Sequence, residues 1–223
     1  MNIGPMTADP PVSPNGPKGS PKRPAVRGNG HDAGIRGARQ TPAQTDPPRF
    51  PMARKFGGHR AIIRLLQMSD RDTLLRFFES HTKETIHLRY GYELSQISQA
   101  RAAELVGVDQ SKDAALGIFE VGEAVPLVAI GRYCLRPHGK SAEVAFVVRE
   151  DRRSMGMASA LLAALVRIAA ARGLASLDGQ VVRGNRPMLE IFGRLGAEKV
   201  AIAGTGSLTV TIDVGRAFRK LGP

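Results

Sequence analysis

One junction in the sequence limits the available folds more than any other: an apolar strand leads through a short basic loop into a long helix. The strand is predicted over residues 141–149 and the helix over 157–172, with Gly173 as its end. The helix has an apolar stripe made of Leu161, Leu162, Leu165 and Ile168. The junction therefore predicts a domain that combines strands with helices.

The loop between these two elements, residues 153–158, is expected to bind an anion. Unpaired N–H groups at the start of a helix point outward and carry a partial positive charge. Gly156 and Ala158 lack bulk, so a phosphate can approach the backbone, and Arg152 and Arg153 add positive charge at the rim. A pyrophosphate suits such a loop. Taken alone, the same residues also fit an ordinary turn whose small side chains allow close packing.

Hydrophobic periodicity and turn residues predict the remaining elements. They are strands at 61–66, 114–121, 125–135, 174–182, 200–203 and 207–214, and helices at 71–80, 83–89, 94–106 and 185–195. Three antiparallel strands in succession thus precede the long helix. We expect one α/β domain of the α+β kind, and we find no internal repeat that would indicate a solenoid.

The N-terminal part differs in composition from the rest. Residues 1–60 hold 11 of the 15 prolines, and their ten basic and three acidic residues supply +7 of the net charge of +12. Such a segment cannot bury enough apolar surface to offset the entropy of ordering it. We expect a disordered tail over 1–58, a folded domain over 59–216 and a C-terminal extension over 217–223. The tail would either bind nucleic acid non-specifically or be a solvated leader, with Met52 as an alternative start.

Targeting signals are not evident in the sequence. The early basic residues are not followed by the apolar run of a secretory signal, and the sequence has no run of about 18 apolar residues. The single cysteine, Cys134, lies in an apolar run, where we expect a core residue. These features favour the cytoplasm.

Residues 142–158 resemble the strand and acyl-CoA loop of the GCN5-related N-acetyltransferases (GNAT), whose pattern there is Gln/Arg-x-x-Gly-x-Gly/Ala. Downstream, residues 184–189 and 195–197 are similar to the family's Asn, then Met or Ala, then Leu-Gly-Phe. The resemblance extends over about residues 60–214. More narrowly, Phe77–Tyr90 and 142–146 are similar to the acetyltransferase domain of bacterial protein-lysine acetyltransferases of the Pat type.

The resemblance implies a GNAT fold: a mixed, mostly antiparallel sheet of six to seven strands with flanking helices. The family's fourth and fifth strands, here 141–149 and 174–182, would splay apart at a bulge, and acetyl-CoA would lie in the gap. Its pantetheine would pair with strand backbone and its pyrophosphate with loop N–H groups, and the Ser159 hydroxyl and Asn185 would add hydrogen bonds. The implied cofactor-binding residues are Phe146, Val147, Val148, Arg153, Ser154, Met155, Gly156, Met157, Ala158, Ser159 and Asn185. As an alternative or additional role, Asn185 would cap the following helix.

Glu143 is the candidate general base. Acyl transfer by direct attack needs a group that accepts the proton of the amine, and a carboxylate inside an apolar strand is costly unless it is paired or functional. Pat-type members similarly place a glutamate here. The alternative is an exposed glutamate, or one paired with an arginine such as Arg132.

The general acid is not evident. Many family members have a tyrosine seven residues after the asparagine, where this chain has Phe192. Water would then protonate the leaving thiolate, and Tyr90, Tyr92 and Tyr133 are more distant candidates. The five histidines show no metal-ligand spacing, so no metal is predicted.

Three functions are compatible with these residues. The first is acetyl transfer to a protein lysine, the second is transfer to a small amine or amino acid, and the third is acyl-CoA binding without turnover. The acceptor would lie near the loops 136–140 and 204–206. The polar-aromatic segment 83–92 would either line the same groove or form a plain amphipathic helix. Family members are often dimers, so a homodimer is a further hypothesis.

Overall fold

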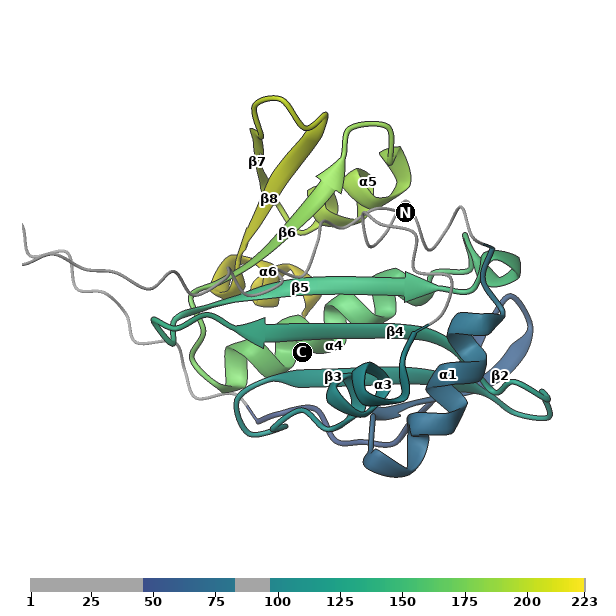
Figure 1. Cartoon of the computed structure of the whole chain (residues 1–223). Coiled ribbons are helices and arrows are strands. Elements are labelled where there is room, and N and C mark those ends of the chain that lie inside the picture. The colour runs from purple at the N-terminus through teal and green to yellow at the C-terminus, as the bar shows by residue number, and fades with distance from the viewer. Residues whose placement is uncertain (1–45, 83–96, 223) are drawn as a thin grey trace, which may run out of the picture. The chain divides into compact units, whose positions relative to one another are not determined.

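A computed structural model describes residues 46–82 and 97–222 of the protein. Its sheet has eight strands in the spatial order β1-β2-β3-β4-β5-β6-β8-β7 (Figure 1). All neighbouring strands are antiparallel except β5 and β6, which are parallel. The strands are β1 (Met52–Phe56), β2 (His59–Leu65), β3 (Ala114–Glu120), β4 (Leu127–Leu135), β5 (Ser141–Val148), β6 (Ser176–Val182), β7 (Glu198–Ala201) and β8 (Ser207–Asp213). The predicted fold class is confirmed, with one strand more than the expected six to seven.

Helices cover both faces of the sheet (Figure 1). They are α1 (Arg71–Glu79), α3 (Gln99–Val106), α4 (Met157–Ala171), α5 (Arg186–Arg194) and α6 (Val214–Leu221), with single 3-10 turns η1 (Met68–Asp70) and η2 (Glu150–Arg152). One buried cluster joins α1 and α3 to one face of the sheet, and a larger one joins α4 to the opposite face. Among the described helices, none has the length and apolar character that crossing a bilayer requires.

The side chains of β5 alternate between these two clusters, as predicted. Val144, Phe146 and Val148 belong to the α4 cluster, whereas Val147 belongs to the cluster under α1 and α3. Because successive strand residues point to opposite faces, Glu143 lies on the α1 and α3 face with Val147. The proposed base is thus on the face opposite the long helix.

The sheet begins earlier than predicted. Strand β1 lies inside the segment 1–58 that was expected to be disordered, and it pairs with β2 along its whole length. Arg54 and Lys55 are exposed, and only Phe56 is buried. An edge strand is held by backbone hydrogen bonds and tolerates charged side chains, so its composition resembles that of a tail. Residues 1–45 lie outside the described part of the chain.

The chain also ends differently from the prediction. Val214 was expected to close the last strand and 217–223 to form an extension, but Val214–Leu221 forms helix α6. Asp213 caps this helix by accepting a hydrogen bond from the Arg216 N–H, and Ala217 is fully buried in the α4 cluster. The helix predicted over 94–106 is described only from Gln99, with Ser98 as its cap. The helix predicted over 83–89 lies outside the described residues.

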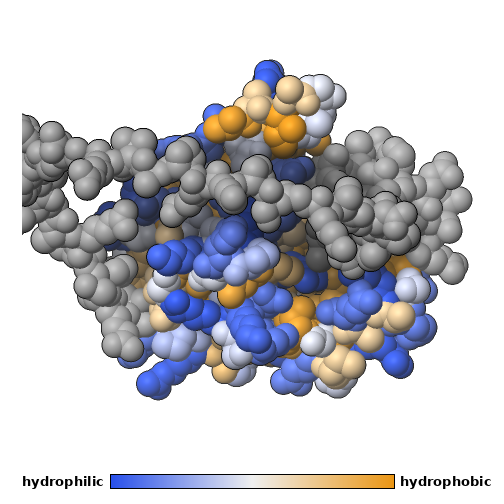
Figure 2. All heavy atoms as spheres, turned by 60° about the vertical axis from the view of Figure 1, so that its left-hand side comes forward, coloured by the Kyte–Doolittle hydropathy of each residue, from blue (hydrophilic) through white to orange (hydrophobic). Residues whose placement is uncertain are grey.

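The hairpin of β7 and β8 is the least buried part of the sheet. All four residues of β7 are exposed, and Val200 is 65% exposed. In Figure 2 the surface in view is largely hydrophilic, and the top of the molecule, where Figure 1 places this hairpin, carries a compact apolar group. Within the described residues, this edge therefore combines the exposed side chain of Val200 with strand backbone that pairs with no further strand.

Asp70 connects β2 to the start of α1. Arg64 donates to both of its carboxylate oxygens at 2.7 and 2.6 Å, and the Gln67 N–H donates to it at 2.8 Å. Burial alone would raise the pKa of Asp70, but the hydrogen bonds from Arg64 and Gln67 and the charge of Arg64 outweigh it and lower the pKa below its ordinary value. The ionised form is thus the one that the fold stabilises.

This pKa shift predicts a pH dependence of stability. A carboxyl whose pKa is lower in the folded than in the unfolded chain stabilises the fold above its unfolded pKa, about 3.9. That contribution is lost as the pH falls through the lower, folded value. We expect Asp70→Asn to destabilise the protein at pH 6 and to differ progressively less from wild type below about pH 4, as measured by urea unfolding. The exposed Asp72→Asn is the control, and a pH-independent difference for Asp70→Asn would contradict the prediction.

Candidate active site

Strands β5 and β6 diverge in the middle of the sheet (Figure 1). They pair only at Ser141 with Ser176, Ala142 with Leu177 and Glu143 with Asp178, although β5 continues to Val148. The splay predicted between these two strands is therefore confirmed.

Gly179 follows the last pair of this ladder. A Cβ at this position would lie 3.3 Å from the Phe192 ring and 3.5 Å from the Val144 carbonyl oxygen, so the residue that ends the pairing has little space for a side chain. The predicted bulge is not found in β5, which pairs with β4 in continuous register. A shift of strand register lies instead between Ile118 and Phe119, where β3 pairs with β4.

The loop after β5 presents a row of backbone donors. Ser154 and Gly156 have φ values of 62° and 84°, and Gly156 is the N-cap of α4. The first helical hydrogen bond runs from the Ala160 N–H to the Gly156 carbonyl. Within the described residues, the N–H groups from Ser154 to Ser159 have no hydrogen-bond acceptor. A Cβ at Gly156 would meet nothing within 4 Å, so the space in front of the loop is open to an anion.

The β1–β2 turn supports this loop from one side. A Cβ at Gly57 would lie 2.9 Å from the Met155 sulfur, so the Met155 side chain rests directly on the glycine. Thr82, three residues after the end of α1, donates from Oγ1 to Glu150 in the turn η2 before the loop, at 2.8 Å. The loop and the turn before it are thus each held by an element that precedes them by many residues.

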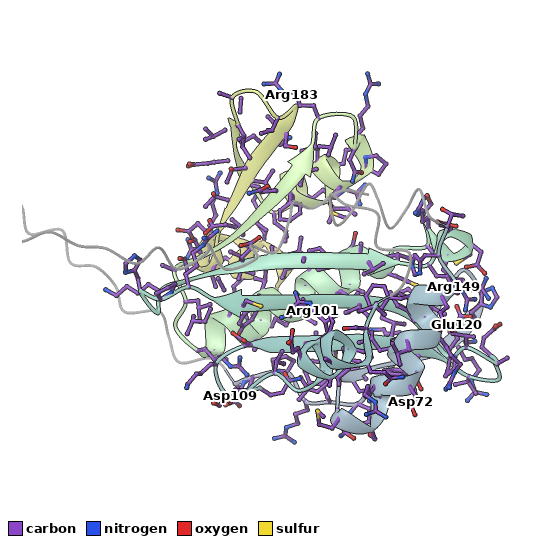
Figure 3. The ribbon with its side chains drawn as sticks, in the orientation of Figure 1. Asp72, Arg101, Asp109, Glu120, Arg149 and Arg183 are labelled. Atoms are coloured by element: carbon purple, nitrogen blue, oxygen red, sulfur yellow. The ribbon has the colours of Figure 1, made fainter. Side chains whose placement is uncertain are left out.

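Arg152 was predicted to add positive charge at the rim of the loop, but it points to Glu120 instead. Its Nε donates to both oxygens of Glu120 at 2.9 and 3.0 Å, and its other nitrogens contact Glu123 and Asp151. Arg149 adds hydrogen bonds to Asp151, and Figure 3 shows Glu120 and Arg149 at the same end of the sheet. The carboxylates neutralise both guanidinium groups, so Arg152 has a structural role. His59 joins this cluster, with its Nδ1 3.8 Å from Glu120.

Arg152→Gln should therefore affect stability more than catalysis. The Glu120 side chain is only 1% exposed, and removing its main partner leaves a buried carboxylate with the more distant His59, at 3.8 Å, in its place. We expect the free energy of unfolding to fall by about 2–3 kcal/mol in urea titrations, with the KM for acetyl-CoA changed less than about threefold.

The control is Arg71→Gln, which breaks an exposed pair with Asp72 and should cost less than about 0.5 kcal/mol. A large rise in KM at unchanged stability would instead assign Arg152 to the phosphate.

Asn185 has the capping role that the sequence allowed, and its amide nitrogen is placed so that the ligand-binding role remains a prediction. Its Oδ1 accepts a hydrogen bond from the Met188 N–H at 3.3 Å and caps α5. Its Nδ2 is enclosed by the protein and has no acceptor among the described residues. Because an enclosed donor is costly when it is left unpaired, this amide is a candidate for a ligand oxygen.

Glu143 lies at the closed end of the splay beside a second carboxylate. Asp178 is its registered partner on β6, and Arg136 lies 3.7 Å from Glu143 and 3.3 Å from Asp178. The partner of Glu143 is thus Arg136 and not Arg132, because the β4–β5 turn brings Arg136 over the end of the ladder. The Glu143 side chain is 31% exposed and remains accessible to a second substrate. Sequence reasoning missed Asp178, although an acidic residue within an apolar strand was a usable signal.

The described part of the chain offers no tyrosine hydroxyl at the splay. Phe192 is fully buried, and its ring lies edge to face with that of Phe146, with the ring centroids 6.4 Å apart. Tyr133 is also fully buried, and its hydroxyl accepts a hydrogen bond from Arg172 at 2.6 Å. Burial raises the pKa of this phenol, which Arg172 opposes only in part. Tyr90 and Tyr92 lie outside the described residues.

Comparison with known proteins identifies the family. Residues 73–197, more than half of the chain, match the Acetyltransferase (GNAT) family. An acetyltransferase from Pseudomonas aeruginosa is 26% identical over 141 residues, which cover 62% of this chain and 75% of that protein.

Two solved structures share the fold. The GNAT domain of S. lividans PAT superposes with a TM-score of 0.65 at 22% identity, covering 73% of this chain and 96% of that one. The PaiA N-acetyltransferase of Thermoplasma acidophilum, solved in complex with coenzyme A, superposes with a TM-score of 0.54 at 16% identity, covering 69% and 98%. A splayed sheet with an open donor loop at its mouth is thus found in a chain whose sequence matches the family over most of its folded part. The chain belongs to the Acetyltransferase (GNAT) family and is an acyltransferase.

Proposed function

We propose that this protein transfers an acetyl group from acetyl-CoA to a primary amine, and that the amine is the side chain of a protein lysine. The observation that carries the proposal is the row of N–H groups from Ser154 to Ser159, which have no acceptor in the part of the chain that the structure describes. The row lies at the mouth of a splay that has Glu143 at its closed end. An anion site and a carboxylate on the same strand–loop–helix unit are what this reaction requires.

Acetyl-CoA would bind along β5. Its pyrophosphate would accept hydrogen bonds from the loop backbone of Ser154–Ala158 and from the Ser159 hydroxyl. The Arg153 N–H, which was predicted to join them, donates to the Glu150 carbonyl at 3.3 Å instead. Its pantetheine would lie beside Phe146, Val147 and Val148, where β6 has left β5. The enclosed Nδ2 of Asn185 would donate to an oxygen of the same arm. Coenzyme A in the PaiA structure supports this choice of ligand.

Glu143 would act as the general base. A lysine amine is mostly protonated at neutral pH, because its pKa is about 10.4, and the ammonium form cannot attack. Glu143 takes one proton of the ammonium group and passes it to water, and the neutral amine nitrogen then bonds to the thioester carbon. The tetrahedral intermediate collapses, the carbon–sulfur bond breaks, and the nitrogen loses its second proton, which reaches the leaving CoA thiolate through water. Because Phe192 cannot donate a proton, the thiolate leaves without help from this position.

Two arguments favour a protein lysine as the acceptor: the charge at the closed end of the splay and the similarity to a known acetyltransferase domain. Among the described residues, the ion pairs of Glu143 and Asp178 are both with Arg136, and the two carboxylates at the closed end of the splay favour a cationic amine. The likeness to the GNAT domain of a protein named PAT agrees with the narrower sequence resemblance. A small-molecule amine has the same charge and is the second candidate. The homodimer, the cytoplasmic location and the binding role of the tail are also proposals.

The test is acetyl transfer with defined acceptors. Purified full-length protein with acetyl-CoA is incubated with lysine peptides, folded proteins, polyamines and free amino acids, and CoA release is measured. We expect turnover with lysine in peptides or proteins. Labelling of small amines but never of protein lysine would favour the second candidate. Acetyl-CoA binding without CoA release for any acceptor would indicate a binding module.

A further inference from the structure

Arg132 differs from Arg149, Arg152 and Arg172, which are also buried or half-buried. Its Nη2 donates to the Cys134 sulfur at 2.9 Å, but its Nε and Nη1 are enclosed and have no acceptor among the described residues. By contrast, Arg149 and Arg152 meet carboxylates, and Arg172 donates to the carbonyls of Gln110 and Asp113 and to a phenol. A guanidinium with two enclosed nitrogens, which carry three N–H groups, and no carboxylate partner is costly in a folded protein.

The position of Arg132 connects this cost with the reaction. Arg132 pairs across β4 and β5 with Ala145, and the next pair on the same face is Cys134 with Glu143. Ile130 and Val147, the preceding pair on this face, belong to the cluster under α1 and α3. Arg132 therefore lies on the same face as the proposed base, one strand away from the splay, and its neighbour on β5 is the short side chain of Ala145.

We propose that Arg132 is a substrate-binding residue whose Nε and Nη1 donate to a substrate oxygen that carries or develops negative charge. Two oxygens have this chemistry. One is the thioester carbonyl oxygen, which becomes an oxyanion when the amine attacks, and the other is a carboxylate oxygen of the acceptor. The proposal rests on the proposed acyl transfer and adds a residue to it. The charge left unpaired in the free protein is then paired during the reaction.

Arg132→Met tests the proposal through stability and kinetics together. Methionine has a similar length and no charge, so the variant removes the unpaired cation without opening a cavity. We expect the Tm of the ligand-free protein to rise by about 2 °C and kcat/KM to fall by about thirtyfold. If Arg132 had a purely structural role, Arg132→Met would have a lower Tm than the wild type. Arg132→Lys, which keeps the charge, should recover part of the activity.

Arg172→Met is the matched control, because this guanidinium has acceptors for its hydrogen bonds. The Tm of Arg172→Met should fall, whereas that of Arg132→Met should rise. The kinetic parameters of Arg132→Met then identify the oxygen. A lower kcat at unchanged KM values assigns the thioester oxygen, and a higher acceptor KM at unchanged kcat assigns an acceptor carboxylate.

Two failures can be told apart. Wild-type protein that releases no CoA with any amine would count against the proposed acyl transfer. Wild-type turnover, together with an Arg132→Met variant that has unchanged kinetics or a lower Tm, would overturn the role of Arg132 alone.

Discussion

Gly156→Val is expected to raise the KM for acetyl-CoA by about a hundredfold or more, which corresponds to ~3 kcal/mol of lost binding. Gly156 has a φ of 84°, which a β-branched residue adopts only at a cost of about 1–2 kcal/mol, so the loop backbone should move. The new side chain would also project into the open space in front of the donor row. Initial rates at varied acetyl-CoA, with calorimetric titration of CoA, measure the effect.

Gly204→Val separates backbone strain from the loss of the anion site. Gly204 has a φ of 75° and, like Gly156, no atom within 4 Å of an added Cβ, but it belongs to the β7–β8 turn. Both variants should lose similar stability, and only Gly156→Val should lose CoA affinity. Equal KM values for acetyl-CoA in the two variants would mean that the pyrophosphate does not lie on the loop 153–158.

Glu143→Gln is expected to lower kcat at pH 7 by about a hundredfold to a thousandfold, because the amine then has no positioned proton acceptor. Affinity for acetyl-CoA should be kept, since the side chain lies at the closed end of the splay and not at the loop. The residual rate of the variant should rise about tenfold for each pH unit between 7 and 9, as the fraction of neutral amine grows. Steady-state CoA release across this pH range measures both effects.

Glu190→Gln is the matched control for this variant, because Glu190 is exposed on α5 and outside the proposed site. It should leave kcat and both KM values within about twofold of wild type. A Glu143→Gln variant with the activity of Glu190→Gln would exclude Glu143 as the base.

The elements near the junction were predicted well because local patterns determine them. The helix predicted over 157–172 is found as Met157–Ala171, and the alternation along β5 places Glu143 and Val147 on one face. These features depend on residues three, four or two positions apart, which a sequence displays directly. The splay was implied by the resemblance and not by the residues themselves.

The features that were missed depend on contacts between distant parts of the chain. Strand β1 is an edge strand whose stability comes from pairing with β2, and its charged residues hide this. Arg152 was assigned to the phosphate because it precedes the loop, yet Glu120 on β3 takes its guanidinium. Which carboxylate meets which arginine depends on strand register, which composition and spacing do not contain. The pairing of Asp178 with Glu143 depends on the same register, although the acidic residue itself was visible within an apolar strand.

The short ladder between β5 and β6 has a consequence for local unfolding. Three residue pairs join the strand set β6, β8 and β7 to the rest of the sheet, whereas β4 and β5 share seven. Regions held by fewer contacts open at lower free energy than the centre of a domain, and their amide hydrogens exchange sooner. A substrate arm lying between the two strand sets would hold them together. Amide exchange in β6 and β8 should therefore slow when acetyl-CoA binds, so that the acyl donor also determines how rigid the C-terminal third of the domain is.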